Sequence, residues 1–242
     1  MKRHVLFSAA FLLAGSLLAA DAKTEVTSAA KKLAETSGYG WKATTETAGG
    51  GGGGGGAMRA GPTEGMALKD GTVCVKMTRG ENTTEAFMKG EKAVIKTESG
   101  WQTPDEMASA GGDQQGNRGR WIGRIVQNYK APAKEVGDMV TKVKELKKDG
   151  DAYVGELTAE GVTSLLTMGR PAGGNAPAPQ NPKGNVKIWL KDGVVAKYEY
   201  RVQATMEFQG NERTIDRTTT VEIKNVGAAK IEVPEEAKKK LS

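Results

Sequence analysis

Alternation of apolar and polar residues is the clearest pattern in this chain, and it is strongest near the C-terminal end. From Val194 to Phe208 every second residue is apolar, and most of the residues between are charged or polar. A period of two is typical of a β-strand that turns one face to a core and the other to water. The segment therefore predicts one long strand.

Shorter strands of the same kind flank the long one. Residues 186–190 alternate in the same way before a turn at Asp192-Gly193. After a second turn at Gly210-Asn211, a return strand continues the pattern with Ile215, Thr219, Val221 and Ile223. Closely spaced turns between alternating segments predict antiparallel hairpins.

The first half of the chain repeats a similar rhythm. Residues 41–47 predict a strand, and residues 63–103 predict a meander of short strands. Its turns contain glycine, at Asp70-Gly71, Gly80-Glu81-Asn82, Gly90-Glu91 and Ser99-Gly100. A further hairpin is expected from 142–148 and 151–158, and a short last strand from Ile231 to Pro234.

Helices are predicted where apolar residues recur at spacings of three and four. The expected helices are 23–37, 120–130, 132–140, 160–168 and 235–241. Residues 104–119 are expected to form an irregular surface loop. The eight glycines at 49–56 and the Pro/Gly-rich segment at 169–184 predict flexible loops, because they carry too little apolar surface to offset the entropy of ordering. The glycine run lacks the Lys-Ser/Thr ending of a phosphate-binding loop.

The first residues have the pattern of a secretory signal peptide. A short basic start at Lys2-Arg3 precedes an apolar run from Val5 to Leu18, which ends in small residues. The run is too short to span a bilayer core of about 30 Å comfortably. We expect residues 1–20 to be removed, with cleavage after Ala22 as the alternative, and the mature protein to be soluble in the periplasm or secreted.

Composition excludes several classes of function. His4, the only histidine, lies in the signal peptide, so the mature chain has no Ser-His-Asp or Cys-His catalysis and no histidine-containing zinc site. No Cys/His cluster or calcium-loop spacing indicates a metal, and no cofactor is indicated. Removal of Lys2 and Arg3 leaves a net charge of +4 that is spread along the chain, which does not indicate nucleic-acid binding. The remaining carboxylates lie mostly on polar faces and in turns, so we expect a protein that is not an enzyme. Cys74, between Val73 and Val75, is expected to be a buried, unreactive thiol, with an intermolecular disulfide or a reactive thiol as the alternatives.

No linker separates two complete cores. The helices lie between two groups of strands, each with a single apolar face, so residues 21–242 predict one α+β domain. We expect a large curved antiparallel sheet, an unclosed β-barrel, covered on its apolar face by several helices.

Three short motifs resemble the bacterial lipoprotein-carrier (LolA-like) superfamily, including its mycobacterial lipoprotein branch, which binds acylated lipids. They are the Gly100-Trp101 step in GEKAVIKTESGWQT, the strand and turn VKIWLKDG at 186–193, and the IEVP ending at 231–234. The glycine run and the 169–184 segment depart from that family, and the lipidation cysteine of the mycobacterial branch is absent. That absence favours a freely diffusing protein.

The resemblance implies an apolar cavity for the acyl chain of a lipid or lipoprotein. Its walls would come from the two long strands and the covering helices: Tyr198, Tyr200, Val202, Met206, Phe208, Ile215, Val221, Ile223, Trp121, Ile125 and Leu166. A periplasmic interaction or sensing domain with a solid core is the alternative, because any α+β core needs the same apolar stripes. The helix with Arg118, Arg120 and Arg124 has a second interpretation as well, transient docking on an anionic membrane surface.

The signal-peptide interpretation makes a direct prediction. The mature protein recovered from its native host should begin at Asp21 or Lys23 and occur in an extracytoplasmic fraction. N-terminal sequencing measures this. A membrane-bound product that retains Met1 would contradict it.

Overall fold

The computed structural model describes residues 10–48, 60–109, 113–166, 178–208 and 211–242. The strands are β1 (Gly38–Thr47), β2 (Ala60–Leu68), β3 (Thr72–Arg79), β4 (Asn82–Lys89), β5 (Lys92–Thr97), β6 (Gly100–Gln102), β7 (Val143–Asp149), β8 (Ala152–Leu157), β9 (Gln180–Lys191), β10 (Val194–Phe208) and β11 (Asn211–Lys224). The helices are α1 (Ala10–Glu35), α2 (Pro104–Ser109), α3 (Asp113–Gln127), α4 (Pro132–Thr141), α5 (Ala159–Leu166) and α6 (Glu235–Leu241).

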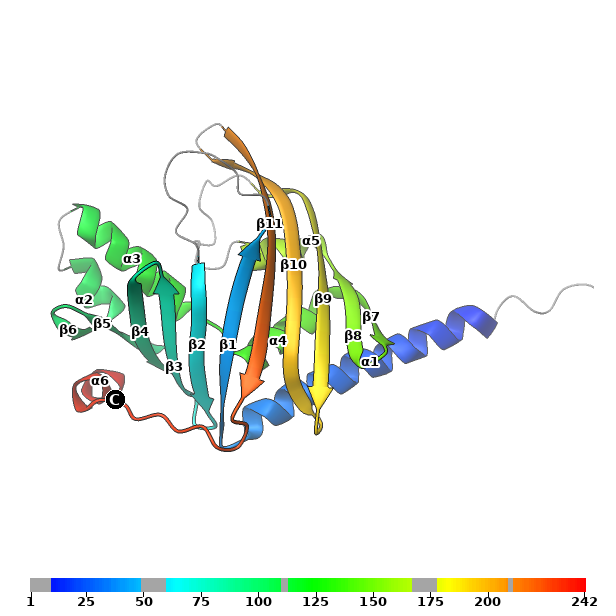
Figure 1. The fold of residues 1–242 in the computed structure, drawn as a ribbon, viewed down its shortest axis with the longest axis horizontal. Helices are drawn as coiled ribbons and strands as arrows, with labels where there is room; N and C mark the ends of the chain where they lie inside the picture. Colours follow the sequence, from blue (N-terminus) through cyan, green and yellow to red (C-terminus); the bar gives the residue numbers. More distant parts are fainter. Residues whose placement is uncertain (1–9, 49–59, 110–112, 167–177, 209–210) are drawn as a thin grey trace, which may run out of the picture.

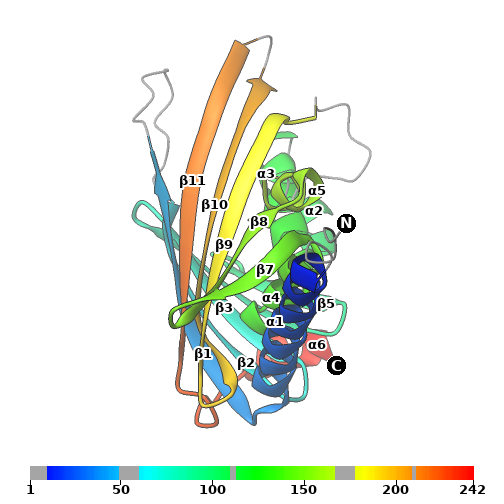
Figure 2. The ribbon, with the colours of Figure 1, turned by 90° about the vertical axis from the view of Figure 1, so that its right-hand side faces the viewer.

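The described strands form one 11-stranded antiparallel sheet in the order β6-β5-β4-β3-β2-β1-β11-β10-β9-β8-β7 (Figure 1). The edge strands β6 and β7 do not pair with each other, so the sheet is not closed into a barrel. It curves, and most of the helices lie on its concave side (Figure 2). The expected α+β class and unclosed, helix-covered sheet are confirmed.

The sheet centre joins the two ends of the chain. β1 pairs with β2 on one side and with β11 on the other, so that Trp41 lies opposite Gly65 and also opposite Ile223. Every other neighbouring pair is consecutive in sequence. The β1–β11 pairing therefore makes one sheet out of two meanders.

The long strand β10 has the predicted bounds. From Tyr198 to Met206 its even-numbered residues are buried on the concave face. The register shifts between Val195 and Lys197, so the buried residue near the start of the strand is Val195 and not its neighbours. Before β10, Asp192 (φ 53°) and Gly193 (φ 75°) both have positive φ, as a tight hairpin turn requires.

Two groups of helices cover the concave face. The larger apolar cluster joins α1, α4 and α5 to β1 and β7–β11, with Leu33, Val136 and Val162 among its members. A second cluster joins Val126 of α3 to β3–β5. The other face of β3–β6 is covered by α6, through Ala237 and Leu241.

Cys74 belongs to the cluster beneath α6. Its side chain is buried, as expected, and burial raises the pKa of the thiol to about 11. The thiolate, which is the reactive form, is therefore disfavoured near neutral pH.

Three expectations were wrong. Much of the loop expected at 104–119 is helical, in α2 and the first part of α3. Residues 180–184, expected to be part of a flexible connection, are the first residues of β9. Residues 231–234 do not join the sheet; Ile231 and Val233 pack instead against the cluster beneath α6. The expected loop at 49–56 and most of 169–184 lie outside the described residues.

The N-terminal helix α1 includes the end of the expected signal peptide. It runs from Ala10 to Glu35 as one helix, and its first turns extend past the edge of the sheet (Figure 1). Its buried residues include Ala22, Val26 and Leu33, all beyond the favoured cleavage site. Within the part of the chain that the structure describes, no helix combines the length and apolar character needed to cross a membrane.

Substitution of Gly65 tests how closely the strands pack at the sheet centre. A Cβ built there would lie 2.2 Å from the Trp41 ring and 2.7 Å from the carbonyl oxygen of Cys74. Because the backbone carbonyl cannot move aside cheaply, Gly65→Ala should destabilise the fold by about 1 to 3 kcal/mol, measured by urea unfolding.

The matched control is Gly137→Ala in α4, where a Cβ would meet nothing within 4 Å. Alanine in a helix interior should raise stability by about 0.5 to 1 kcal/mol. Equal effects of the two substitutions would contradict the close contact between Trp41 and Gly65.

Candidate functional site: the interior of the concave face

The predicted wall residues fall into three groups. Tyr198, Tyr200, Val202, Met206 and Val221 are buried, whereas Ile215, Ile223, Ile125 and Leu166 are half-buried. The side chains of Phe208 and Trp121 lie outside the described part of the chain, although their backbones belong to β10 and α3. Tyr198, Tyr200, Val202 and Val221 share the larger cluster, and Ile223 and Leu166 pack against it. Met206, Ile215 and Ile125 are not members of that cluster.

Part of the concave face is a packed core. Tyr198 and Val202 have no exposed surface and share their cluster with Val26 of α1 and Val136 of α4. The part of the predicted apolar stripe from Tyr198 to Val202 therefore packs against helices.

A second part of the same face is less completely filled. Helices cover the concave face to either side of the sheet centre, but some inward-facing residues at the centre remain half-buried. They are Ala43, Thr45, Thr63, Ile215 and Arg217. They lie on β1, β2 and β11, between the α1/α4/α5 cluster and the α3 cluster. We call these five residues the central patch.

Glu135 brings a carboxyl group into this interior. It lies in the first turn of α4, a helix that begins with Pro132 at a favourable N-terminal position. The hydroxyl of Tyr198 donates a hydrogen bond to Glu135 Oε2, and that of Tyr200 donates to Oε1 over 3.4 Å. Both tyrosines are on β10, so these bonds tie α4 to the long strand.

Burial raises the pKa of Glu135 above its ordinary value, and this effect outweighs the tyrosine hydrogen bonds and the positive charges of Lys130 and Arg217. Burial likewise raises the pKa of Tyr198 and Tyr200, with the charge of Glu135 adding to the shift. The tyrosines therefore remain protonated donors.

Arg217 is the cation of the central patch. It lies on β11 opposite Val202 of β10, and its Nη2 donates a hydrogen bond of 2.9 Å to the carbonyl oxygen of Leu165 in α5. Its Nε is buried and has no hydrogen-bond partner among the described residues. Among the same residues, no carboxylate forms an ion pair with its guanidinium.

Aromatic residues anchor the helices beside this site. The Trp41 indole Nε1 donates a hydrogen bond of 3.1 Å to the Tyr129 hydroxyl, and the two rings stack. The backbone N–H of Ala133 donates to the Tyr39 hydroxyl over 3.2 Å, which satisfies one of the free N–H groups at the start of α4. β1 thus fixes both the end of α3 and the start of α4.

Sequence reasoning missed the two charged residues of the site. Arg217 carried a readable signal, since it occupies an inward position of β11 between Ile215 and Thr219. A charged residue at an inward, otherwise apolar position of a strand is uncommon unless it is paired or functional. Glu135 gave a weaker signal, because a charged residue is ordinary in the first turn of a helix.

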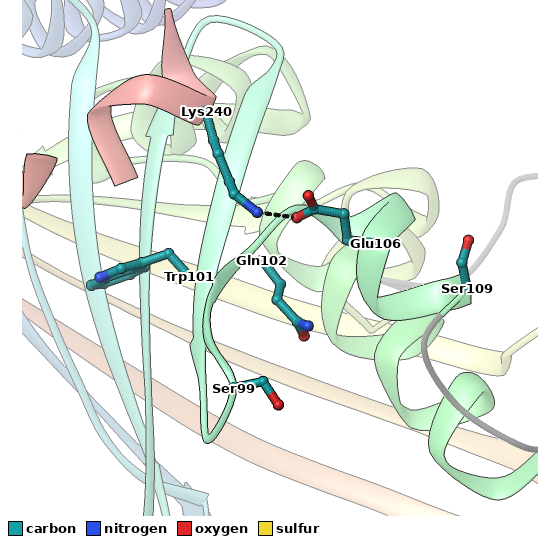
Figure 3. A pocket seen from close by; sticks show the side chains of 6 residues that line it. All are labelled: Ser99, Trp101, Gln102, Glu106, Ser109 and Lys240. Atoms are coloured by element: carbon teal, nitrogen blue, oxygen red, sulfur yellow. Dashed lines mark hydrogen bonds and ion pairs between the residues drawn. The ribbon is translucent and has the colours of Figure 1, made fainter. Parts of the chain in front are cut away.

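A pocket elsewhere offers different chemistry. It has a volume of about 400 Å³ and lies beside β6, where Lys240 of α6 meets Glu106 of α2 at 2.5 Å (Figure 3). Its other lining residues are Ser99, Trp101, Gln102 and Ser109. An exposed ion pair of this kind contributes little binding energy. The described residues contain no group of three or more His, Cys, Asp or Glu that could hold a metal ion.

No protein-family model and no curated protein matches this chain. Among solved structures, LprF from Mycobacterium bovis is 10% identical with a TM-score of 0.44, and the match covers 90% of this chain and 98% of that one. The lipoprotein LppX from Mycobacterium tuberculosis is 11% identical with a TM-score of 0.41, and the match covers 94% of this chain and all of that one.

The raised pKa of Glu135 predicts a pH-dependent effect of its removal. A carboxyl group whose pKa is higher in the folded state stabilises the fold when protonated, and this contribution is lost as the pH rises above its unfolded value of about 4.5. Glu135→Gln, which stays neutral, should therefore gain melting temperature relative to the wild type as the pH rises from 4.5 to 8.

Thermal melts by circular dichroism across this range measure the difference. Glu46→Gln, at an exposed position of β1, controls for the loss of one negative charge. A gain in melting temperature that is largest at pH 4.5 and shrinks towards pH 8 would contradict a raised pKa of Glu135.

Proposed function

We propose that the mature protein is an extracytoplasmic binding or carrier protein for an acylated lipid or lipoprotein. One observation carries the proposal: the central patch stays half-buried between two packed clusters on a helix-covered concave face. A core that only stabilised a fold would be expected to fill such positions completely. The signal-peptide pattern and the carrier-like motifs of the sequence support the same function.

The acyl chain lies along the inward side of the β10–β11 hairpin in this proposal. Met206 of β10 and Ile215 of β11 form one wall, and Tyr200, Val202 and Ile223 continue the apolar stripe into the packed cluster under the helices. Of the other residues named from the sequence, Tyr198 and Val221 are packed in the same cluster, Leu166 of α5 packs against it, and Ile125 lies on α3. Binding needs no cofactor and no covalent chemistry.

The energetics suit a carrier. Ten buried methylenes contribute roughly 8 kcal/mol, at about 0.8 kcal/mol each. Association costs about 4 kcal/mol or more in lost translational and rotational freedom. The modest net affinity would let the protein release its cargo. Arg120 and Arg124 of α3 are exposed, which supports transient contact with an anionic membrane surface during transfer.

Ala204→Leu tests the proposal. Ala204 faces inward on β10, opposite the half-buried Ile215. If the space beside it receives the ligand, leucine should weaken the binding of a fluorescent long-chain fatty acid about tenfold or more and leave the melting temperature within a few degrees of wild type.

The matched control is Thr205→Leu, one residue further along the strand and facing the opposite side of the sheet. It should leave acyl binding unchanged. Absence of saturable binding by wild type, together with a loss of about 1 to 3 kcal/mol in Ala204→Leu, would show a solid interior. That outcome would favour the alternative function, an interaction or sensing domain.

A further inference from the structure

Arg217 is a cation inside the concave face that the described residues leave only partly satisfied. One hydrogen bond, from Nη2 to the Leu165 carbonyl oxygen, holds its guanidinium at α5. The Nε–H is buried and unpaired, and no described carboxylate forms an ion pair with the group. An unsatisfied buried donor is destabilising, so its presence in a folded protein calls for an explanation.

Glu135 does not supply the missing partner. Its two carboxyl oxygens accept hydrogen bonds from Tyr198 and Tyr200, which lie on β10, whereas Arg217 lies on β11. The positive charge of Arg217 counteracts the rise in the pKa of Glu135, but among the described residues no ion pair or hydrogen bond joins the two groups, so the Nε–H of Arg217 keeps no partner.

The geometry of a guanidinium selects the partner. Its planar fork of N–H donors matches the two oxygens of a carboxylate or phosphate, and it has no acceptor. In a site partly withdrawn from water such a charge-assisted contact is stronger than in bulk water. The inward neighbours of Arg217 are Val202 on β10, Ile215 and Thr219 on β11, and Thr47 on β1.

We propose that Arg217 binds the anionic head group, a carboxylate or a phosphate, of the acyl ligand. The inference rests on the proposed function and specifies its ligand class: an amphiphile with an oxyanion next to its acyl chain. The head group lies at Arg217, and the chain runs past Ile215 and Ala204 towards Met206, along the inward positions of the β10–β11 hairpin. The Leu165 carbonyl orients the guanidinium from the α5 side.

The test compares two probes with the same tail. Pyrene-labelled hexadecanoic acid carries the oxyanion, and its methyl ester does not. Wild type should bind the acid about ten- to a hundredfold more tightly than the ester, as expected for one or two charge-assisted hydrogen bonds. Arg217→Gln should abolish this preference by weakening acid binding by that factor, and should leave ester binding unchanged.

Two variants complete the design. Arg217→Lys keeps the charge without the fork and should retain a smaller preference for the acid. Arg201→Gln is the matched control: Arg201 is exposed on the opposite face of β10, where it forms an ion pair with Asp216 at 2.6 Å. It should leave both affinities unchanged. Circular dichroism checks that each variant is folded.

Unlabelled palmitate and palmitoyl lysophosphatidate, used as competitors, distinguish the two head groups. Stronger Arg217-dependent competition by one of them identifies a carboxylate or a phosphate as the preferred partner. Equal affinity of wild type for acid and ester, or equal losses for both in Arg217→Gln, would overturn the head-group assignment and leave acyl binding intact. Failure of wild type to bind either probe would overturn the proposed function as well.

Discussion

The pairing of β1 with β11 is the constraint on which the rest of the structure depends. It joins strands that are far apart in sequence and lie at the centre of the sheet, with Trp41 opposite Ile223 and Thr45 opposite Thr219. Such a contact has a high cost in chain entropy, which the apolar surface buried around it must offset. Without this pairing the two meanders would be separate sheets.

The same pairing determines where the helices pack. Tyr39 and Trp41 of β1 bind the start of α4 and Tyr129 just beyond the end of α3, while α1 packs across the concave face against β7 and β10. α4 is then held to β10 by the tyrosine hydrogen bonds to Glu135. Because a carboxyl group partly withdrawn from water needs such donors, these bonds hold α4 and β10 in one relative position.

The interior combines a packed region with a polar one. Fully buried residues such as Tyr198 and Val202 stabilise the domain, whereas the half-buried Ile215 and Arg217 lie where stability alone does not explain them. Proteins commonly depart from the best local choice at functional positions. Under the proposed function, the first region holds the helical cover in place and the second is where the acyl chain would bind.

Much of this architecture was predictable from the sequence because it depends on local patterns. Period-two alternation identified β10 with its bounds, glycine-containing turns located the hairpins, and amphipathic spacing indicated most of the helices. The sequence did not reveal the helical nature of 104–109, nor that 231–234 packs outside the sheet, because both depend on packing against distant strands. Only the tertiary structure brought Glu135 to Tyr198 and Tyr200 and placed Arg217 in the interior without a carboxylate partner among the described residues. These relations arise from strand register and from helix packing between segments far apart in the chain, which no local pattern encodes.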